Sequence, residues 1–134
     1  MSLREAPEWL EKETILALHA ESLAEHGGAD GLRDDGLLES ALARPLQLFS
    51  YGDPPPDLAA LAAAYCVGLA KNHAFVDGNK RIAFIALLTF LMVNGSRLTA
   101  TQPDAYQTII AVASGTMDDQ TLAAWIRTNS EPLA

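Results

Sequence analysis

The apolar residues of this chain recur at helical spacing, and no run of useful length alternates as in a strand. Residues 9–26 predict a helix that stops at Gly27-Gly28, with its apolar face formed by Leu10, Ile15, Leu16, Leu18, Ala20 and Leu23. A short helix is expected to begin after Asp34 or Asp35, whose carboxylates suit an N-cap. Pro45 should close it, because proline and the residue before it disfavour helix.

The second half of the chain continues this helical pattern. Three consecutive prolines predict a loop over residues 44–57, since they exclude both helix and sheet interior. Further helices are expected after an Asp57 cap to about residue 71, over residues 79–93 and 103–114, and from Thr116 or Asp118 through Leu122, Trp125 and Ile126. The fold class is therefore all-α, a compact six-helix bundle with a single domain over residues 1–134.

The helix expected over residues 79–93 is apolar nearly all round, which is typical of a central helix packed on several sides. Its first turn belongs to the segment His73–Arg81, with the sequence HAFVDGNKR, which places a possible proton acceptor, a carboxylate and two cations within nine residues. We therefore expect that segment to lie at the bottom of a cleft formed by the ends of surrounding helices.

Composition narrows the class of partner. The net charge of −8 argues against nucleic-acid binding, which normally needs a basic face. The single cysteine, Cys66, lies in an apolar run and is expected to be a buried, inert thiol, as suits the cytoplasm. Residues 1–5 contain no apolar core of a signal peptide, and no apolar run reaches the length of a membrane span.

Residues 78–81 have the character of a phosphate site. Gly78 can adopt a positive φ and allows a ligand close to the backbone, and the N–H groups that follow would form an anion nest at a helix start. Lys80 and Arg81 point about 100° apart on a helix, so they converge only on a group beyond its end. Arg81 suits bidentate clamping of phosphate oxygens, and Lys80 supplies a point charge.

The other motif residues suggest chemistry on that phosphate. Asp77 would repel a bare phosphate but could coordinate Mg²⁺ bound to it. A histidine titrates near neutral pH, so His73 can accept a proton from a hydroxyl. Phe75 is expected to anchor the turn in the core. The spacing alone leaves another interpretation open, in which Asp-Gly-Asn is only a turn and Lys-Arg a solvated helix start.

His19 and His26, on the first helix, are expected at surface or partly packed positions without a role. Arg33 and Asp34 are expected to be structural, with Asp34 as a helix cap, although Arg33 could also reach the cleft.

The segment His73–Arg81 resembles the signature of the Fic/Doc superfamily, His-x-Phe-x-Asp/Glu-Gly-Asn-x-Arg. Lysine between Asn79 and Arg81 is similar to the Doc (death-on-curing) toxin branch. The similarity extends upstream and downstream, through Gly27-Gly28, Gly31–Asp34, Gly36–Ala41, Pro45, Ala62–Tyr65, Asn72, Phe90-Leu91, Asn94-Gly95 and Leu122–Trp125.

This resemblance implies a transferase that modifies a protein hydroxyl. By resemblance His73 is the general base, Asp77 the magnesium and phosphate-orienting carboxylate, Gly78 and Asn79 the phosphate-binding turn, and Arg81 the phosphate clamp. Most Fic enzymes transfer AMP and have glycine where this chain has Lys80. In the Doc branch, lysine goes with a reversed ATP pose and transfer of the γ-phosphate to Ser or Thr. The family target is elongation factor Tu, whose modification stops translation.

The chain departs from the family pattern in two places, and the second departure bears on regulation. Ala74 replaces a proline of many Fic proteins, so the turn loses one fixed φ. In the nearest match to the self-inhibitory helix of the family, Glu25 comes one residue early and His26 takes its place, so we expect no intrinsic brake. Doc-like toxins are instead restrained by a small antitoxin whose disordered tail folds into a groove.

Residues 44–56 occupy the sequence position of a flap that docks the target chain in the family. A rigid connector is the other interpretation of this proline-rich segment. For the whole protein, the leading hypothesis is a Doc-like kinase toxin. The alternatives are an AMP-transferring Fic enzyme and an inactive module that binds nucleotide or antitoxin.

Overall fold

A computed structural model describes residues 5–133, and helices carry most of that part of the chain. The elements are α1 (Lys12–His26), α2 (Asp35–Tyr51), α3 (Leu58–Asn72), α4 (Asn79–Val93), β1 (Ser96–Leu98), α5 (Gln102–Ser114), α6 (Asp119–Thr128) and β2 (Ser130–Pro132). The all-α prediction is confirmed. Residues 1–4, which carried most of the expectation about a signal peptide, lie outside the described residues.

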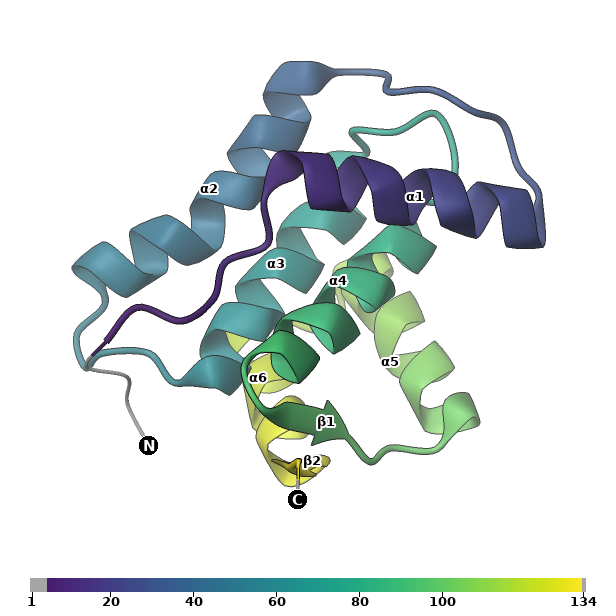
Figure 1. The fold of residues 1–134 in the computed structure, drawn as a ribbon. Coiled ribbons are helices and arrows are strands. Elements are labelled where there is room, and N and C mark those ends of the chain that lie inside the picture. Colours follow the sequence, from purple (N-terminus) through teal and green to yellow (C-terminus); the bar gives the residue numbers. More distant parts are fainter. Residues whose placement is uncertain (1–4, 134) are drawn as a thin grey trace.

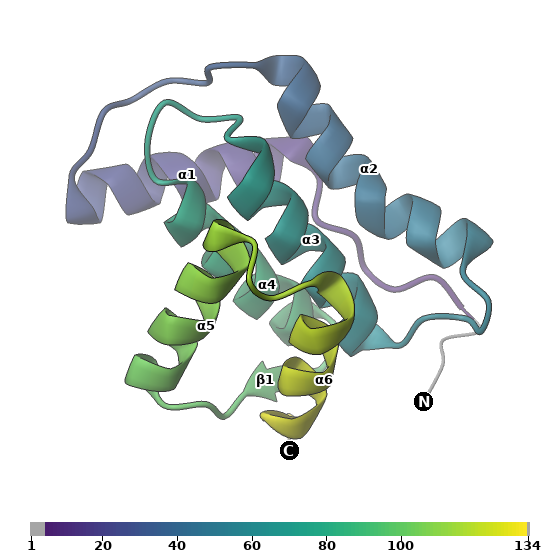
Figure 2. The same cartoon turned by 180° about the vertical axis from the view of Figure 1, so that it is seen from behind.

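Helices α3 and α4 run in roughly opposite directions and form the middle of the molecule (Figure 1). α1 crosses one side of this pair, α5 and α6 lie on the other, and α2 flanks α3 (Figures 1 and 2). Every residue from Leu61 to Ala70 is buried. The centre is therefore shared, and α3 is more deeply buried than α4, which was predicted to be the central helix. The remaining face of α4 lines a cavity described below.

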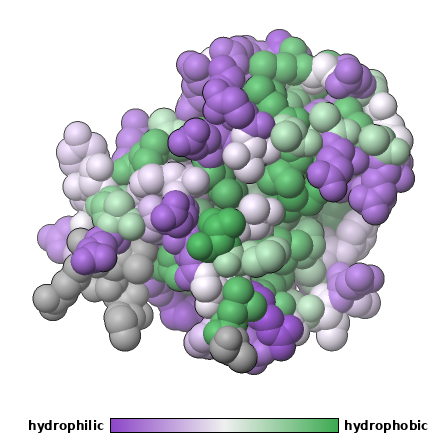
Figure 3. Space-filling view, viewed as in Figure 1, coloured by the Kyte–Doolittle hydropathy of each residue, from purple (hydrophilic) through white to green (hydrophobic). Residues whose placement is uncertain are grey.

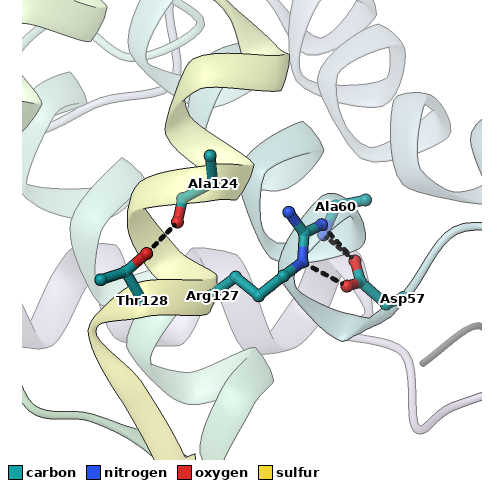
Figure 4. A network of polar contacts seen from close by, with 5 residues as sticks. All are labelled: Asp57, Ala60, Ala124, Arg127 and Thr128. Carbon is teal, nitrogen blue, oxygen red and sulfur yellow. Dashed lines mark hydrogen bonds and ion pairs between the residues drawn. The ribbon is translucent and has the colours of Figure 1, made fainter.

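Helix starts agree with their predicted caps. The side chains of Asp34, Asp57 and Asp118 each accept a hydrogen bond from a backbone N–H in the first turn of α2, α3 and α6. Asp57 also receives two hydrogen bonds from Arg127 of α6, at 2.6 and 2.9 Å (Figure 4). Partial burial opposes ionisation of Asp57, but the hydrogen bonds from Arg127 and Ala60 outweigh it and lower the pKa of the carboxyl. This pair ties α6 to the start of α3.

Pro45 does not end α2, as the sequence pattern predicted, and the expected loop over residues 44–57 shrinks to Gly52–Asp57. A proline inside a helix leaves the carbonyl four residues earlier, here that of Ala41, without its helical partner. Ala41 packs directly on Gly68 of α3, where an added Cβ would lie only 3.2 Å from that carbonyl oxygen. Burial of Leu38, Ala41 and Pro45 offsets the local cost and lets the helix continue.

Two short strands escaped the sequence analysis. β1 and β2 form an antiparallel pair that joins the segment after α4 to the residues after α6. Each strand has three residues, which is too short for an alternating pattern to stand out.

The interior is apolar, and Cys66 lies within it. Burial raises the pKa of the Cys66 thiol to about 12, so the thiol is inert, as predicted. On the face seen in Figure 3, hydrophobic residues are concentrated in the middle and hydrophilic residues around the margin. No helix within residues 5–133 combines the length and apolar character needed to cross a membrane.

Candidate active site

The predicted site residues line one cavity of about 1110 Å³, hereafter the site cavity. His73 ends α3, Gly78 caps α4, and the turn between them carries Asp77. The walls include His26 at the end of α1, the outer face of α4, and α5. The expectation of a cleft at the start of α4 is confirmed, and the cleft contains His73, Asp77, Gly78, Asn79, Lys80 and Arg81.

The Asn79 side chain locks the turn. Its Oδ1 accepts the N–H of Phe75 at 3.1 Å, and its Nδ2 donates to the carbonyl of Phe75 at 2.9 Å. Phe75 is only 2 % exposed, so it anchors the turn in the core, as predicted. The side chain of Asn79 therefore shapes the turn, and its backbone N–H is available to a ligand.

Gly78 adopts φ 76°, the left-handed conformation expected of it. The first helical hydrogen bond of α4 runs from the N–H of Ile82 to the carbonyl of Gly78. The N–H groups of Asn79, Lys80 and Arg81 therefore lack intrahelical acceptors and face the end of the helix. The N–H of Gly78 donates to Asp77 Oδ1 at 2.7 Å, so the expected nest narrows from four N–H groups to three.

Asp77 is held by backbone groups from two segments. Its Oδ1 accepts the N–H of Gly78, and its Oδ2 accepts the N–H of Ala29 at 3.2 Å. These two hydrogen bonds, and less strongly the nearby Arg81, lower the pKa of the carboxyl. Asp77 is therefore ionised at neutral pH, and its exposed oxygens keep further lone pairs for a cation.

A dedicated metal cage is absent from residues 5–133, where no group of three or more His, Cys, Asp or Glu residues could hold an ion. A single carboxylate fits Mg²⁺, which is usually bound by one or two carboxylates together with substrate phosphates and water. Asp77 is the residue in the site cavity that meets this requirement.

Arg81 and Lys80 both line the site cavity, but their side chains differ in how they are held in place. The guanidinium of Arg81 donates to the carbonyls of Ser22, at 3.5 Å, and Gly27, at 3.3 Å, at the end of α1. A cation is favourable there, because the carbonyl end of a helix is partly negative. Lys80 is exposed. Both cations therefore line the same cavity as the free N–H groups of α4.

His73 has the left-handed conformation, with φ 52° and ψ 48°. Among the described residues it is the only non-glycine residue with a positive φ. Arg33 stabilises it by donating from Nε to the carbonyl of His73 at 2.8 Å. The next carbonyl, of Ala74, accepts the N–H groups of Arg33 and Asp34. Arg33 and Asp34 are thus structural, as expected, and His73 is exposed and lines the site cavity.

His19 was expected at a surface or partly packed position without a role, and this expectation is wrong, because His19 is buried and supports the motif turn. It is 3 % exposed, stacks on Phe75 with ring centroids 3.7 Å apart, and its Nε2 lies 2.8 Å from the carbonyl oxygen of Asp77. A carbonyl only accepts, so Nε2 must carry the hydrogen. The only sequence signal was the position of His19 on the apolar side of α1, close to Ile15 and Leu23.

We expect His19→Phe to lower the free energy of unfolding by about 1–2 kcal/mol, because the ring stack remains but the hydrogen bond to Asp77 is lost. Urea unfolding followed by circular dichroism measures this. His26→Phe, on the same helix but exposed, is the control and should change stability by less than about 0.5 kcal/mol. Equal effects of the two changes would contradict the role of His19.

The regulatory expectations also have structural counterparts. At the end of α1, His26 lines the site cavity and Glu25 does not, which agrees with the one-residue offset noted in the sequence. Residues 52–57 lead into the start of α3, whereas His73 ends it, and none of them lines the site cavity, which favours the interpretation of this segment as a connector. Leu32, between α1 and α2, instead pairs with Phe75 of the motif in an isolated antiparallel bridge.

The comparisons with known proteins agree with this geometry. The sequence model of the Fic/DOC family matches residues 9–91, a range that includes α1, α2, α3 and the whole motif. The curated protein Toxin Doc of Mycolicibacterium smegmatis is 50 % identical to this chain over 94 residues, which is 69 % of each chain. Family membership makes a transferase the expected class of enzyme. The chain therefore belongs to the Fic/Doc family, in the branch of the Doc toxins.

Proposed function

We propose that this protein is a toxin that transfers the γ-phosphate of ATP to a Ser or Thr hydroxyl of a protein. One observation carries the proposal: a single cavity gathers the His73 imidazole, an ionised Asp77, Arg81, and the free N–H end of α4. Together these groups suit a phosphate chain, a divalent cation and an acceptor hydroxyl.

In this mechanism the polyphosphate lies against the N–H groups of residues 79–81, between Lys80 and Arg81. Asp77 would hold Mg²⁺, which supplies charge neutralisation on the phosphate oxygens. His73 takes the proton of the acceptor hydroxyl as the oxygen bonds to the γ-phosphorus. The bond from that phosphorus to the β–γ bridging oxygen breaks, and ADP leaves. Positioning and charge stabilisation provide most of the catalysis, as in phosphoryl transfer generally.

Lys80 supports γ-phosphate transfer over AMP transfer. AMP-transferring Fic enzymes have glycine at this position, where backbone can approach the phosphates closely. A lysine adds bulk and a positive charge at the mouth of the anion site, so the phosphates settle differently. The side chain of Lys80 is exposed in the site cavity, where it can meet a terminal phosphate.

The partners follow by analogy with the Doc branch. The proposed target is elongation factor Tu in the cytoplasm, and the proposed inhibitor is a small antitoxin acting in trans. The net charge of −8 supports a protein target over a nucleic acid.

The test uses ATP labelled at the α or the γ phosphate, incubated with the protein, Mg²⁺ and purified elongation factor Tu. Transfer of γ label to a Ser or Thr supports the proposal, and His73→Ala should reduce it at least a hundredfold. Transfer of α label would indicate an AMP transferase instead. A second assay replaces elongation factor Tu with a bacterial lysate. If neither label is transferred in either assay, the protein is a binding module and not a transferase. A different labelled protein would correct the target alone.

A further inference from the structure

We propose that the end of α1 and the glycine-rich segment after it act as a clasp that holds Asp77 and Arg81 apart and correctly placed for magnesium and nucleotide. The clasp consists of Ser22, Gly27, Gly28 and Ala29, and it acts through backbone groups. These are positioning residues, because they reach the ligand only through the two motif side chains. The inference rests on the proposed function and deepens it.

The first half of the clasp holds the cation. Two different nitrogens of the Arg81 guanidinium donate to the carbonyls of Ser22 and Gly27. The remaining N–H groups of the guanidinium stay free for phosphate oxygens. α1 ends at His26, so one carbonyl (Ser22) comes just before the last turn of α1 and the other (Gly27) belongs to the residue after the helix.

The second half holds the carboxylate. Two residues beyond Gly27, the N–H of Ala29 donates to Asp77 Oδ2. Gly28 makes this approach possible, because a Cβ built on it would lie 2.9 Å from the same oxygen. Gly28 also has φ +124°, a conformation that other residues rarely adopt.

The clasp keeps apart two motif side chains of opposite charge. Asp77 and Arg81 have opposite charges, lie four residues apart at one helix start, and attract each other without a ligand. An ion pair between them would fill the space intended for phosphate and would satisfy the groups meant to bind it. Within residues 5–133 no such ion pair forms, since the carbonyls of α1 hold the guanidinium and the N–H of Ala29 holds the carboxylate.

The main test compares Gly28→Ala with Gly31→Ala. Both glycines have nearly the same φ, +124° and +128°, so backbone strain is matched, but a Cβ at Gly31 would meet only Val76, at 3.4 Å. Calorimetry would measure ATP binding with Mg²⁺ and, separately, with EDTA. We expect Gly28→Ala to weaken binding about tenfold with Mg²⁺ and less than about twofold with EDTA, because the carboxylate is displaced and the N–H end of α4 is not. Gly31→Ala should change neither affinity by more than about twofold.

If Gly28 had only a structural role, Gly28→Ala would weaken ATP binding equally with Mg²⁺ and with EDTA. That result, or equal affinities of Gly28→Ala and Gly31→Ala, would overturn the inference and leave the proposed function intact. If the unmodified protein binds no nucleotide at all, the proposed function fails instead. The clasp is then decided by amide hydrogen exchange. Asp77→Ala should speed exchange at the Ala29 amide, whereas Asp34→Ala should speed it only at Leu37, whose N–H the Asp34 side chain accepts. An unchanged Ala29 amide would refute the clasp.

Discussion

Replacing Arg81 with alanine is expected to lower the rate of phosphate transfer about a thousandfold, at least as much as His73→Ala. Charge in the transition state lies on the phosphate oxygens, and Arg81 is the half-buried cation that the fold fixes beside the N–H end of α4. A general base acts only on the incoming hydroxyl, so its removal should cost no more.

Single-turnover transfer of labelled phosphate to the target measures both variants, with thermal unfolding as a check that each is folded. Arg81→Lys is the matched control. It keeps the charge but loses the planar fork, so we expect an intermediate rate, between those of the unmodified protein and Arg81→Ala. Transfer by Arg81→Ala at the unmodified rate would remove Arg81 from the mechanism.

Asp77→Asn is expected to lower the rate at saturating ATP at least about a hundredfold and to weaken its dependence on magnesium. The substitution keeps the shape of the side chain and one oxygen acceptor, but it removes the charge that a divalent cation requires. Because the pKa of Asp77 is lowered by the N–H groups of Gly78 and Ala29, the carboxylate should stay ionised across the neutral range. Its protonation should therefore limit activity only in acid, below the ordinary range for an aspartate.

A magnesium titration of the transfer rate, for the unmodified protein and for Asp77→Asn, measures this effect. Asp34→Asn is the control, because the side chain of Asp34 caps α2 and does not line the site cavity. That variant should retain its magnesium response. If Asp77→Asn needed the same magnesium concentration and kept its rate, another group would have to hold the cation.

Local signals in the sequence were strong enough for most of the fold and for the motif itself. Asp34, Asp57 and Asp118 can each satisfy a free N–H at a helix start without help from distant residues. The same holds for the left-handed Gly78, whose conformation depends on its missing Cβ. The roles assigned to His73, Asp77, Lys80 and Arg81 remain predictions, but their convergence on one cavity follows from their place between two helices.

Contacts between segments far apart in the chain decided the rest. Pro45 reads as a helix stop, yet packing of α2 on Gly68 of α3 carries the helix through it. Nothing in the sequence assigned a role to His19, but in the fold its Nε2 donates to the carbonyl of Asp77, 58 residues away. The support of Arg81 and part of the support of Asp77 come from backbone groups at and just after the end of α1, and in the sequence only Gly28 hints at this contact. The sequence by itself determined the helices and the reactive turn, because those depend on neighbouring residues. Only the tertiary structure determined what holds the turn open, because that depends on which distant backbone groups the packed core brings to it.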